Sequence, residues 1–346
     1  MVTAITGASG HIGAHLVRLL IAQGQSVRAL VRRNTKPLDG LACETVKGDL
    51  LDRESLTSLC SGASTVFHLG GVISLQGDQD GHVHSVNVTG TQNIVQAAIA
   101  SNVETVVLCS SIQAFEARQA DSKTIDETSP RPTSRAPAYD RSKWTGEQTF
   151  LETAGDHIKA VIVNPTGVIG PWDFAPSRMG QFFLDLAANR LPFLVHGGAD
   201  WVDVRDVSSG IVAAARTGEH QHNYILGGQN ASLRELSELA SQFTQQRTHM
   251  AVVPIALARL GLPFAALMNR LRRQEPAFTG ESLRALESMP VISHQKASDT
   301  LGYTPRPLFQ TITDLYAWHL QQNHPSTSGY AKSVQEKLMA MEVGLQ

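Results

Sequence analysis

Along the first half of the chain, short runs of apolar and β-branched residues alternate with segments whose apolar residues recur at helical spacing. The first run, 2–6, has no polar alternation and therefore predicts a short strand buried within a parallel sheet. Leu16, Leu19 and Leu20 then follow at the spacing of one helix face. The same reasoning predicts strands at 26–31, 44–47, 65–71, 105–110 and 157–163, and a helix at 83–100.

This alternation over residues 1–165 predicts an α/β fold, a Rossmann-type doubly wound parallel sheet with helices on both faces. Over 166–325 the elements become short and Gly and Pro frequent, which predicts a smaller C-terminal substrate-binding lobe with some elements interleaved with the first domain. A polar, proline-containing stretch at 121–137 is expected to form a loop over the site, and 326–346 a tail. Helices are predicted in the second lobe at 178–188, 207–216, 233–242, 255–272 and 309–320.

A glycine-rich turn joins the first strand to the first helix. Gly7 can adopt the positive φ of a tight turn, Gly10 keeps a Cβ away from an approaching pyrophosphate, and Gly13 lets the helix pack closely on the strand. The free N–H groups at the start of the helix attract phosphate. The turn therefore predicts a dinucleotide site, with an ordinary strand–helix turn as the alternative. The predicted site also includes Ser9, His11 and Ile12.

The second strand, 26–31, ends about 20 residues beyond the glycine turn, where an acidic residue would bind the ribose hydroxyls of NAD. Arg32 and Arg33 stand there instead. A guanidinium can bind a 2′-phosphate through two hydrogen bonds, whereas a carboxylate would repel it. Arg32 therefore favours NADP(H) over NAD(H), and the alternative is two solvated arginines after a surface strand.

Tyr139 and Lys143 are four residues apart, so on a helix they share one face. A phenol titrates at about pH 10, and a nearby ammonium group stabilises the phenolate. The same ammonium can hold the ribose hydroxyls of a nicotinamide cofactor. Both residues are therefore candidates for catalysis and for cofactor binding, with an exposed pair on a helix surface as the alternative.

Overall charge and cysteine content exclude several classes of partner. The chain has 29 basic and 31 acidic residues among 346, a balance that suggests neither nucleic acid nor an anionic membrane surface as a partner. Cys43, Cys60 and Cys109 have no metal-ligand spacing, so no metal site is expected. These few cysteines, and a first apolar stretch that is interrupted at Gly7, favour the reducing cytoplasm.

The stretch 251–271 is largely apolar, but Pro254 and Pro263 interrupt it, which argues against a transmembrane helix. Arg272 and Arg273 follow it, so a helix lying on a membrane surface is one interpretation. A helix of a lid or of the substrate-binding lobe is the interpretation we favour, because buried apolar stretches are common.

The chain resembles the extended, or atypical, short-chain dehydrogenase/reductase superfamily over roughly residues 1–320. The resemblance rests on T-G-x-x-G-x-x-G at 6–13, Tyr-x-x-x-Lys at 139–143 and the stretch 163–171. Within it, the NAD-dependent epimerase/dehydratase family and its dihydroflavonol-4-reductase-like and hopanoid-associated sugar-epimerase-like branch are most similar. The resemblance implies that Ser111 orients the substrate carbonyl, with Ser110 a structural neighbour. Related proteins often pair through a helix bundle, so it also allows a homodimer. Further cofactor contacts that it implies are Asp49, Leu50, Leu69, Gly70, Gly71, Asn164, Pro165 and Val168.

Two departures from the family pattern bear on the substrate. Nucleotide-sugar enzymes of the family place an arginine before an Asp-aromatic pair to bind the substrate diphosphate, and here Ala199 precedes Asp200-Trp201. The serine signature also lacks its Val-Tyr-Gly ending. Reduction of a carbonyl on a small apolar or aromatic molecule by NADPH is therefore favoured, with an NAD-dependent sugar epimerase or dehydratase and a non-catalytic NAD(P)-sensing protein as alternatives. Candidate pocket aromatics, which are otherwise core residues, are Phe115, Trp172, Phe174, Phe182, Phe183 and Trp201.

Overall fold

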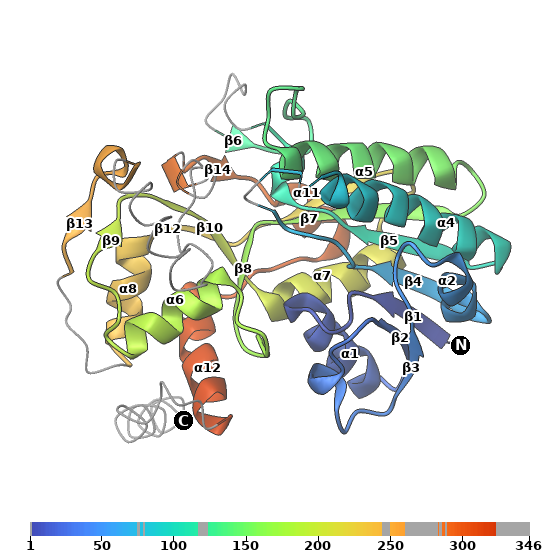
Figure 1. Ribbon diagram of the computed structural model, residues 1–346, viewed down its shortest axis with the longest axis horizontal. Helices are drawn as coiled ribbons and strands as arrows, with labels where there is room; N and C mark the ends of the chain where they lie inside the picture. The colour runs from blue at the N-terminus through green and yellow to red at the C-terminus, as the bar shows by residue number, and fades with distance from the viewer. Residues whose placement is uncertain are drawn as a thin grey trace.

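The computed structural model describes residues 2–74, 77–78, 80–116, 124–243, 250–259, 283, 286–287 and 289–322. Its main sheet has seven parallel strands in the order β11-β7-β5-β4-β1-β2-β3 (Figure 1), which confirms the predicted doubly wound fold. The strand order reverses between β1 and β4, and folds of this kind bind ligands at the carboxyl ends of the strands beside such a reversal. The strands are β1 (Val2–Thr6), β2 (Ser26–Val31), β3 (Cys43–Lys47), β4 (Ala63–His68), β5 (Thr105–Cys109), β7 (Lys159–Pro165) and β11 (Asn223–Leu226).

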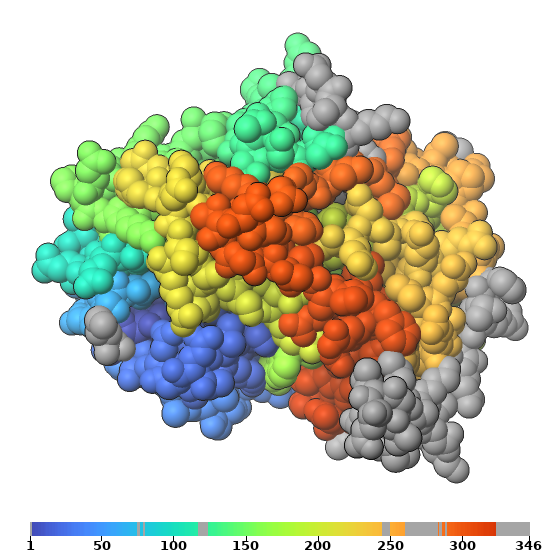
Figure 2. All heavy atoms as spheres, turned by 180° about the vertical axis from the view of Figure 1, so that it is seen from behind, coloured from blue at the N-terminus to red at the C-terminus, as the bar shows by residue number. Residues whose placement is uncertain are grey.

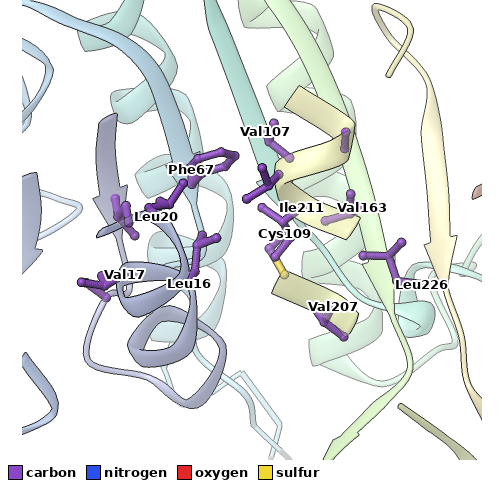
Figure 3. Close-up of a cluster of buried hydrophobic side chains, with 14 of the residues drawn as sticks. Leu16, Val17, Leu20, Phe67, Val107, Cys109, Val163, Val207, Ile211 and Leu226 are labelled. Carbon is purple, nitrogen blue, oxygen red and sulfur yellow. The ribbon is translucent and has the colours of Figure 1, made fainter. Parts of the chain in front are cut away.

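Helices cover both faces of this sheet (Figure 1). One apolar cluster joins the sheet to α1 and α7, and a second joins it to α2, α4 and α5. In the first cluster, Leu16 and Leu20 of α1 and Ile211 of α7 are buried next to the strands (Figure 3). Burial of one such side chain contributes roughly 1.5–3 kcal/mol, so these contacts fix both helices against the sheet. The helices are α1 (His11–Ala22), α2 (Arg53–Cys60), α4 (Gly90–Ala100), α5 (Ala138–Ala154) and α7 (Val204–Thr217).

The helix predicted at 83–100 begins as α3 (His82–His84), widens into a π-helical turn at Ser85–Thr89 and continues as α4. The hydroxyl of Thr91, on α4, donates to the carbonyl of Asn87 in the wide turn at 2.8 Å. The Asn87 amide also bonds both main-chain groups of Val72 and the hydroxyl of Ser142 on α5. Wide turns of this kind are frequent at functional sites, and this one lies beside the carboxyl end of β4.

The second lobe has its own small sheet and core. Three strands, β8 (Gly167–Ile169), β10 (Gly198–Asp203) and β12 (Gln229–Ser232), pack with helices α6 (Arg178–Ala187), α8 (Leu233–Ser241) and α12 (Leu308–Gln321). The predicted helices at 178–188, 233–242 and 309–320 are thus confirmed within one or two residues. Two further strand pairs are β9 (Leu194–Val195) with β13 (Val252–Val253) and β6 (Thr124–Ile125) with β14 (Val291–Ile292).

The two parts of the chain are interleaved. β11 and α7 come from beyond residue 165 but join the first sheet and its helix layer. Seen from behind (Figure 2), the orange-red segment that follows residue 289 crosses this face of the molecule. Its helix α11 (Gln295–Leu301) contacts α7 and β11, whereas α12 contacts α8 and β10. The C-terminal segment therefore ties the second lobe to the first.

Several sequence predictions fall partly outside the described residues. The helix predicted at 255–272 is helical over 255–259, and its remainder lies outside them, as does the tail at 326–346. The loop predicted at 121–137 is described from residue 124, where it opens with the short strand β6 and otherwise has no regular structure before α5. Within the described part of the chain, no helix is long and apolar enough to cross a membrane.

Candidate active site

The glycine turn has the geometry that its sequence predicts. Gly7 has a φ of +70°, and a Cβ there would lie 2.6 Å from the carbonyl carbon of Leu69. A Cβ at Gly13 would lie 2.2 Å from the Gly7 carbonyl oxygen, so any side chain would push helix α1 away from the turn. Gly10 caps α1, is exposed, and offers no side-chain acceptor to the N–H groups of the first helical turn. These open N–H groups fit a pyrophosphate.

A chain of hydrogen bonds connects this turn to the neighbouring one at Leu69–Gly71. The Gly70 N–H donates to the Thr6 hydroxyl at 3.1 Å, and that hydroxyl is 2.7 Å from His68 Nδ1. His68 Nε2 is 3.0 Å from the hydroxyl of Thr91, whose proton is already given to the Asn87 carbonyl. His68 therefore donates through Nε2 and accepts from Thr6 through Nδ1. Burial and the Lys143 charge lower the pKa of His68 to about 3, so the ring is neutral.

Arg32, Asp49 and Leu50, which are predicted to lie near an adenine, follow the carboxyl ends of β2 and β3. Arg32 follows β2 directly, and its guanidinium is 3.5 Å from the carboxylate of Asp49, which follows β3. Both side chains are solvent-accessible, so their ion pair contributes at most about 1 kcal/mol. Leu50 is buried beneath the Gly70 turn, where a Cβ on Gly70 would lie 3.0 Å from its Cδ1.

Tyr139 and Lys143 lie on the first turns of α5, at the carboxyl end of β5. The Lys143 ammonium is 3.4 Å from the carbonyl oxygen of Cys109, the last residue of β5, and 5.9 Å from the centre of the Tyr139 ring. A Cβ on Gly71 would lie 3.5 Å from this ammonium, so the lysine also adjoins the Gly70–Gly71 turn. The predicted pair therefore shares one helix face, and its lysine adjoins the Gly70–Gly71 turn.

Ser111 lies where β5 gives way to a short 3-10 turn, Ile112–Ala114, which packs against α5. It has an extended backbone and is half-buried. Its Oγ accepts the N–H of Gln113 at 3.2 Å, so its own proton remains available to another acceptor. Ser111 thus stands at the same edge of the sheet as Lys143, whereas Ser110 is buried.

Sequence reasoning missed a buried cluster behind Ser111. Glu147, one helical turn after Lys143, is 1 % exposed and accepts hydrogen bonds from Arg131, Asn164 and Asn223. Burial raises the pKa of Glu147, and the Arg131 charge and neighbouring side-chain hydrogen bonds partly offset that rise. No local pattern could reveal the cluster, because its members come from a loop, a helix and two strands.

The remaining predicted cofactor contacts lie in β7, in β8, in the glycine turn and at the start of α1. The amide of Asn164 is buried and donates to Glu147 and to the Ser111 carbonyl. Pro165 ends β7, and Val168 is half-buried in β8. Ser9 and Ile12 are half-buried in the glycine turn and the start of α1. Whether these residues contact a cofactor stays a prediction.

The candidate aromatic residues do not form one pocket. Phe183 and Trp201 are buried in the core of the second lobe, as expected if they are core residues rather than pocket residues. Phe115 packs against the Arg131 guanidinium, 3.8 Å from it. Trp172 instead adjoins α1, with its ring 4.9 Å from that of His15, while His11 Nε2 bonds the Pro171 carbonyl at 2.9 Å.

The family comparison agrees with this geometry. Residues 3–227 match the model of the NAD dependent epimerase/dehydratase family, a stretch that contains every predicted site residue. The chain is 31% identical over 322 residues to sterol demethylase protein B of Methylococcus capsulatus, covering 92% of this chain and 98% of the relative. It is 32% identical over 339 residues to a putative dihydroflavonol 4-reductase of Synechocystis, covering 95% and 96%.

A solved structure extends the likeness to three dimensions. The protein named gox2253 superimposes with a TM-score of 0.78 at 31% sequence identity, covering 93% of this chain and 98% of that one. Both lobes are therefore included in the match.

Proposed function

Because the chain belongs to the NAD-dependent epimerase/dehydratase family, we propose that it is an NADP(H)-dependent oxidoreductase that reduces a carbonyl group of a small, largely apolar or aromatic molecule. The observation that carries the proposal is the place of the Lys143 ammonium, between the end of β5, the Tyr139 ring and the Gly70–Gly71 turn. One cation there can serve both a phenol and a ribose.

The reaction adds a hydride and a proton across the carbonyl group. When bound, the reduced nicotinamide supplies the hydride to the carbonyl carbon. The Ser111 hydroxyl donates a hydrogen bond to the carbonyl oxygen, since its Oγ already accepts from Gln113. Tyr139 gives its proton to the same oxygen, and the Lys143 charge stabilises the phenolate that remains. Donors set in place beforehand thus meet the charge that develops on oxygen.

Two features support an apolar substrate over a nucleotide sugar. Ala199 stands where a diphosphate-binding arginine is expected, and the adjoining Asp200 is buried and bonded to Thr166 and to the Gly228 N–H. The two relatives reported above are named for a sterol and for a dihydroflavonol. An NAD-dependent epimerase or dehydratase is the second candidate, because the Asp49 carboxylate lies beside Arg32 at the adenine end.

Replacement of Tyr139 by Phe tests the proton transfer. We expect turnover of an aryl ketone by NADPH to fall at least about 100-fold, the scale of general acid catalysis, while the dissociation constant of NADPH changes less than two-fold. Tyr224→Phe is the matched control, because it removes a hydroxyl that accepts from the Glu219 N–H at the outer strand β11. Turnover retained in Tyr139→Phe would refute the assignment.

A paired titration with NADPH and NADH tests the cofactor preference. We expect tighter binding of NADPH, and a rise of about ten- to hundred-fold in its dissociation constant in Arg32→Ala, since a charge-assisted hydrogen bond contributes about 1.5–3 kcal/mol. NADH binding should be unchanged, as should both affinities in Arg234→Ala, which alters an exposed arginine on α8. Purified protein that retains NAD, or prefers NADH, would instead favour the epimerase or dehydratase.

A further inference from the structure

Glu147 lies behind the proposed catalytic residues, and no step of the proposed reaction uses its carboxylate. Its carboxylate receives Asn164 Nδ2 at 2.6 Å, Asn223 Nδ2 at 3.0 Å and Arg131 Nη1 at 3.2 Å. Burying a carboxylate is costly unless hydrogen bonds and an opposite charge compensate. Here both oxygens are engaged, so the group has one arrangement.

Two of these partners extend to the turn that carries Ser111. Asn164 Nδ2 also donates to the Ser111 carbonyl at 3.0 Å, and Arg131 Nη1 also donates to the Ala114 carbonyl at 3.1 Å. Both ends of the 3-10 turn are therefore bonded to groups that Glu147 orients. No other side chain of the described structure is bonded to both of these donors.

The Arg131 guanidinium is fixed on two more sides. Its central carbon lies 3.8 Å from the Phe115 ring centre and 4.6 Å from that of Trp144 on α5. Phe115 follows the 3-10 turn, so the stack joins the turn to the helix of Tyr139 and Lys143. The carboxylate of Glu147 holds the arginine in this position through their ion pair.

We propose that Glu147 is a positioning residue, which fixes the Ser111 hydroxyl relative to Tyr139 and Lys143 through Asn164 and Arg131. The inference rests on the role proposed for Ser111. In Glu147→Gln, one carboxylate oxygen becomes an NH₂ group that faces a donor, so either Asn164 or Arg131 loses its acceptor and is no longer held in position against the turn. Misplacement of a reacting group by about 1 Å can lower the rate about 100-fold.

A double-mutant cycle with Ser111→Ala separates positioning from general stability. With an aryl ketone and NADPH, we expect Glu147→Gln to lower kcat about ten- to hundred-fold while the dissociation constant of NADPH changes less than two-fold. In the Ser111→Ala background the same substitution should lower kcat less than two-fold further, because the hydroxyl that it positions is absent. The control is Glu152→Gln, an exposed position on the same helix, which should leave kcat unchanged.

Two further outcomes of the cycle decide the proposal. If Glu147→Gln lowers kcat by the same factor with and without the Ser111 hydroxyl, the proposal is overturned. If Glu147→Gln does not fold, Glu147→Asp keeps the charge but withdraws it by one methylene, and it takes the same place in the cycle.

A crystal structure of the variant gives a readout that needs no activity. We expect the Ser111 hydroxyl to be displaced, with a break in either the bond from Asn164 to the Ser111 carbonyl or the bond from Arg131 to the Ala114 carbonyl. An unmoved turn would overturn the positioning role. The proposed function would instead be contradicted by a wild type that does not reduce the ketone, or by full turnover in Ser111→Ala. In either case the crystal structure of the variant still shows whether Glu147 positions the turn.

Discussion

At the scale of single residues, a neutral histidine connects the segments that would surround a dinucleotide. His68 takes a hydrogen bond from Thr6, at the end of β1, and gives one to Thr91, on α4. The Thr6 hydroxyl also accepts from the Gly70 N–H. A protonated ring would place a second N–H at Nδ1, where the Thr6 hydroxyl now donates, and would disturb β1, α4 and the Gly70 turn together. The neutral ring is therefore part of the folded structure, and its protonation should oppose folding.

The unfolding free energy should accordingly fall in acid. Because burial lowers the pKa of His68 from 6.5 to about 3, the unfolded chain binds a proton between these values that the folded chain does not. The full stability is present above pH 6.5, and about 1.4 kcal/mol should be lost for each pH unit below it. His15, whose pKa burial lowers to about 4, acts in the same sense.

Urea unfolding of the wild type and of His68→Gln between pH 7.5 and 4.5 measures this effect. The variant should show a slope against pH that is shallower by about 1.4 kcal/mol per unit below pH 6. At pH 7.5, where the ring is neutral in both states, the comparison gives the cost of the substitution alone. Equal slopes in the two proteins would mean that His68 takes up its proton in the folded state as readily as in the unfolded one.

At the scale of elements, the sequence predicted those features that depend only on residues close together in the chain. The strand at 26–31 and the turn at Gly7 were predictable because apolar runs and a positive φ depend on neighbouring residues. The pairing of Tyr139 with Lys143 on one face of α5 follows in the same way from helical spacing.

Features that depend on distant segments could not be predicted. β11 is four residues long, and so short an apolar run cannot be distinguished from part of a buried helix. The Glu147 cluster collects partners 16, 17 and 76 residues away along the chain. The sequence around Glu147 therefore gives no sign that its carboxylate is buried. For the same reason the candidate aromatics could not be divided beforehand into core residues and site residues.

At the scale of the whole molecule, an ion pair joins the two parts that would enclose a substrate. Asp206 lies on α7, which packs against the first sheet, and Arg306 lies just before α12 of the second lobe. The Arg306 guanidinium is 2.7 and 2.8 Å from one Asp206 oxygen, and the Arg306 N–H donates to the other at 2.7 Å. Asp203 adds a second carboxylate at 3.8 Å from the same guanidinium.

Removal of this guanidinium should loosen the second lobe. Arg306→Met keeps most of the side-chain volume but leaves the buried Asp206 carboxylate without its cation, and loss of one partner of a buried pair costs about 3–5 kcal/mol. Arg234→Met breaks the exposed pair with Glu238 and should cost less than about 1 kcal/mol. Urea unfolding of both variants measures the difference. A cost for Arg306→Met as small as that for Arg234→Met would show that apolar contacts of α11 and α12, rather than the ion pair, hold the lobes together.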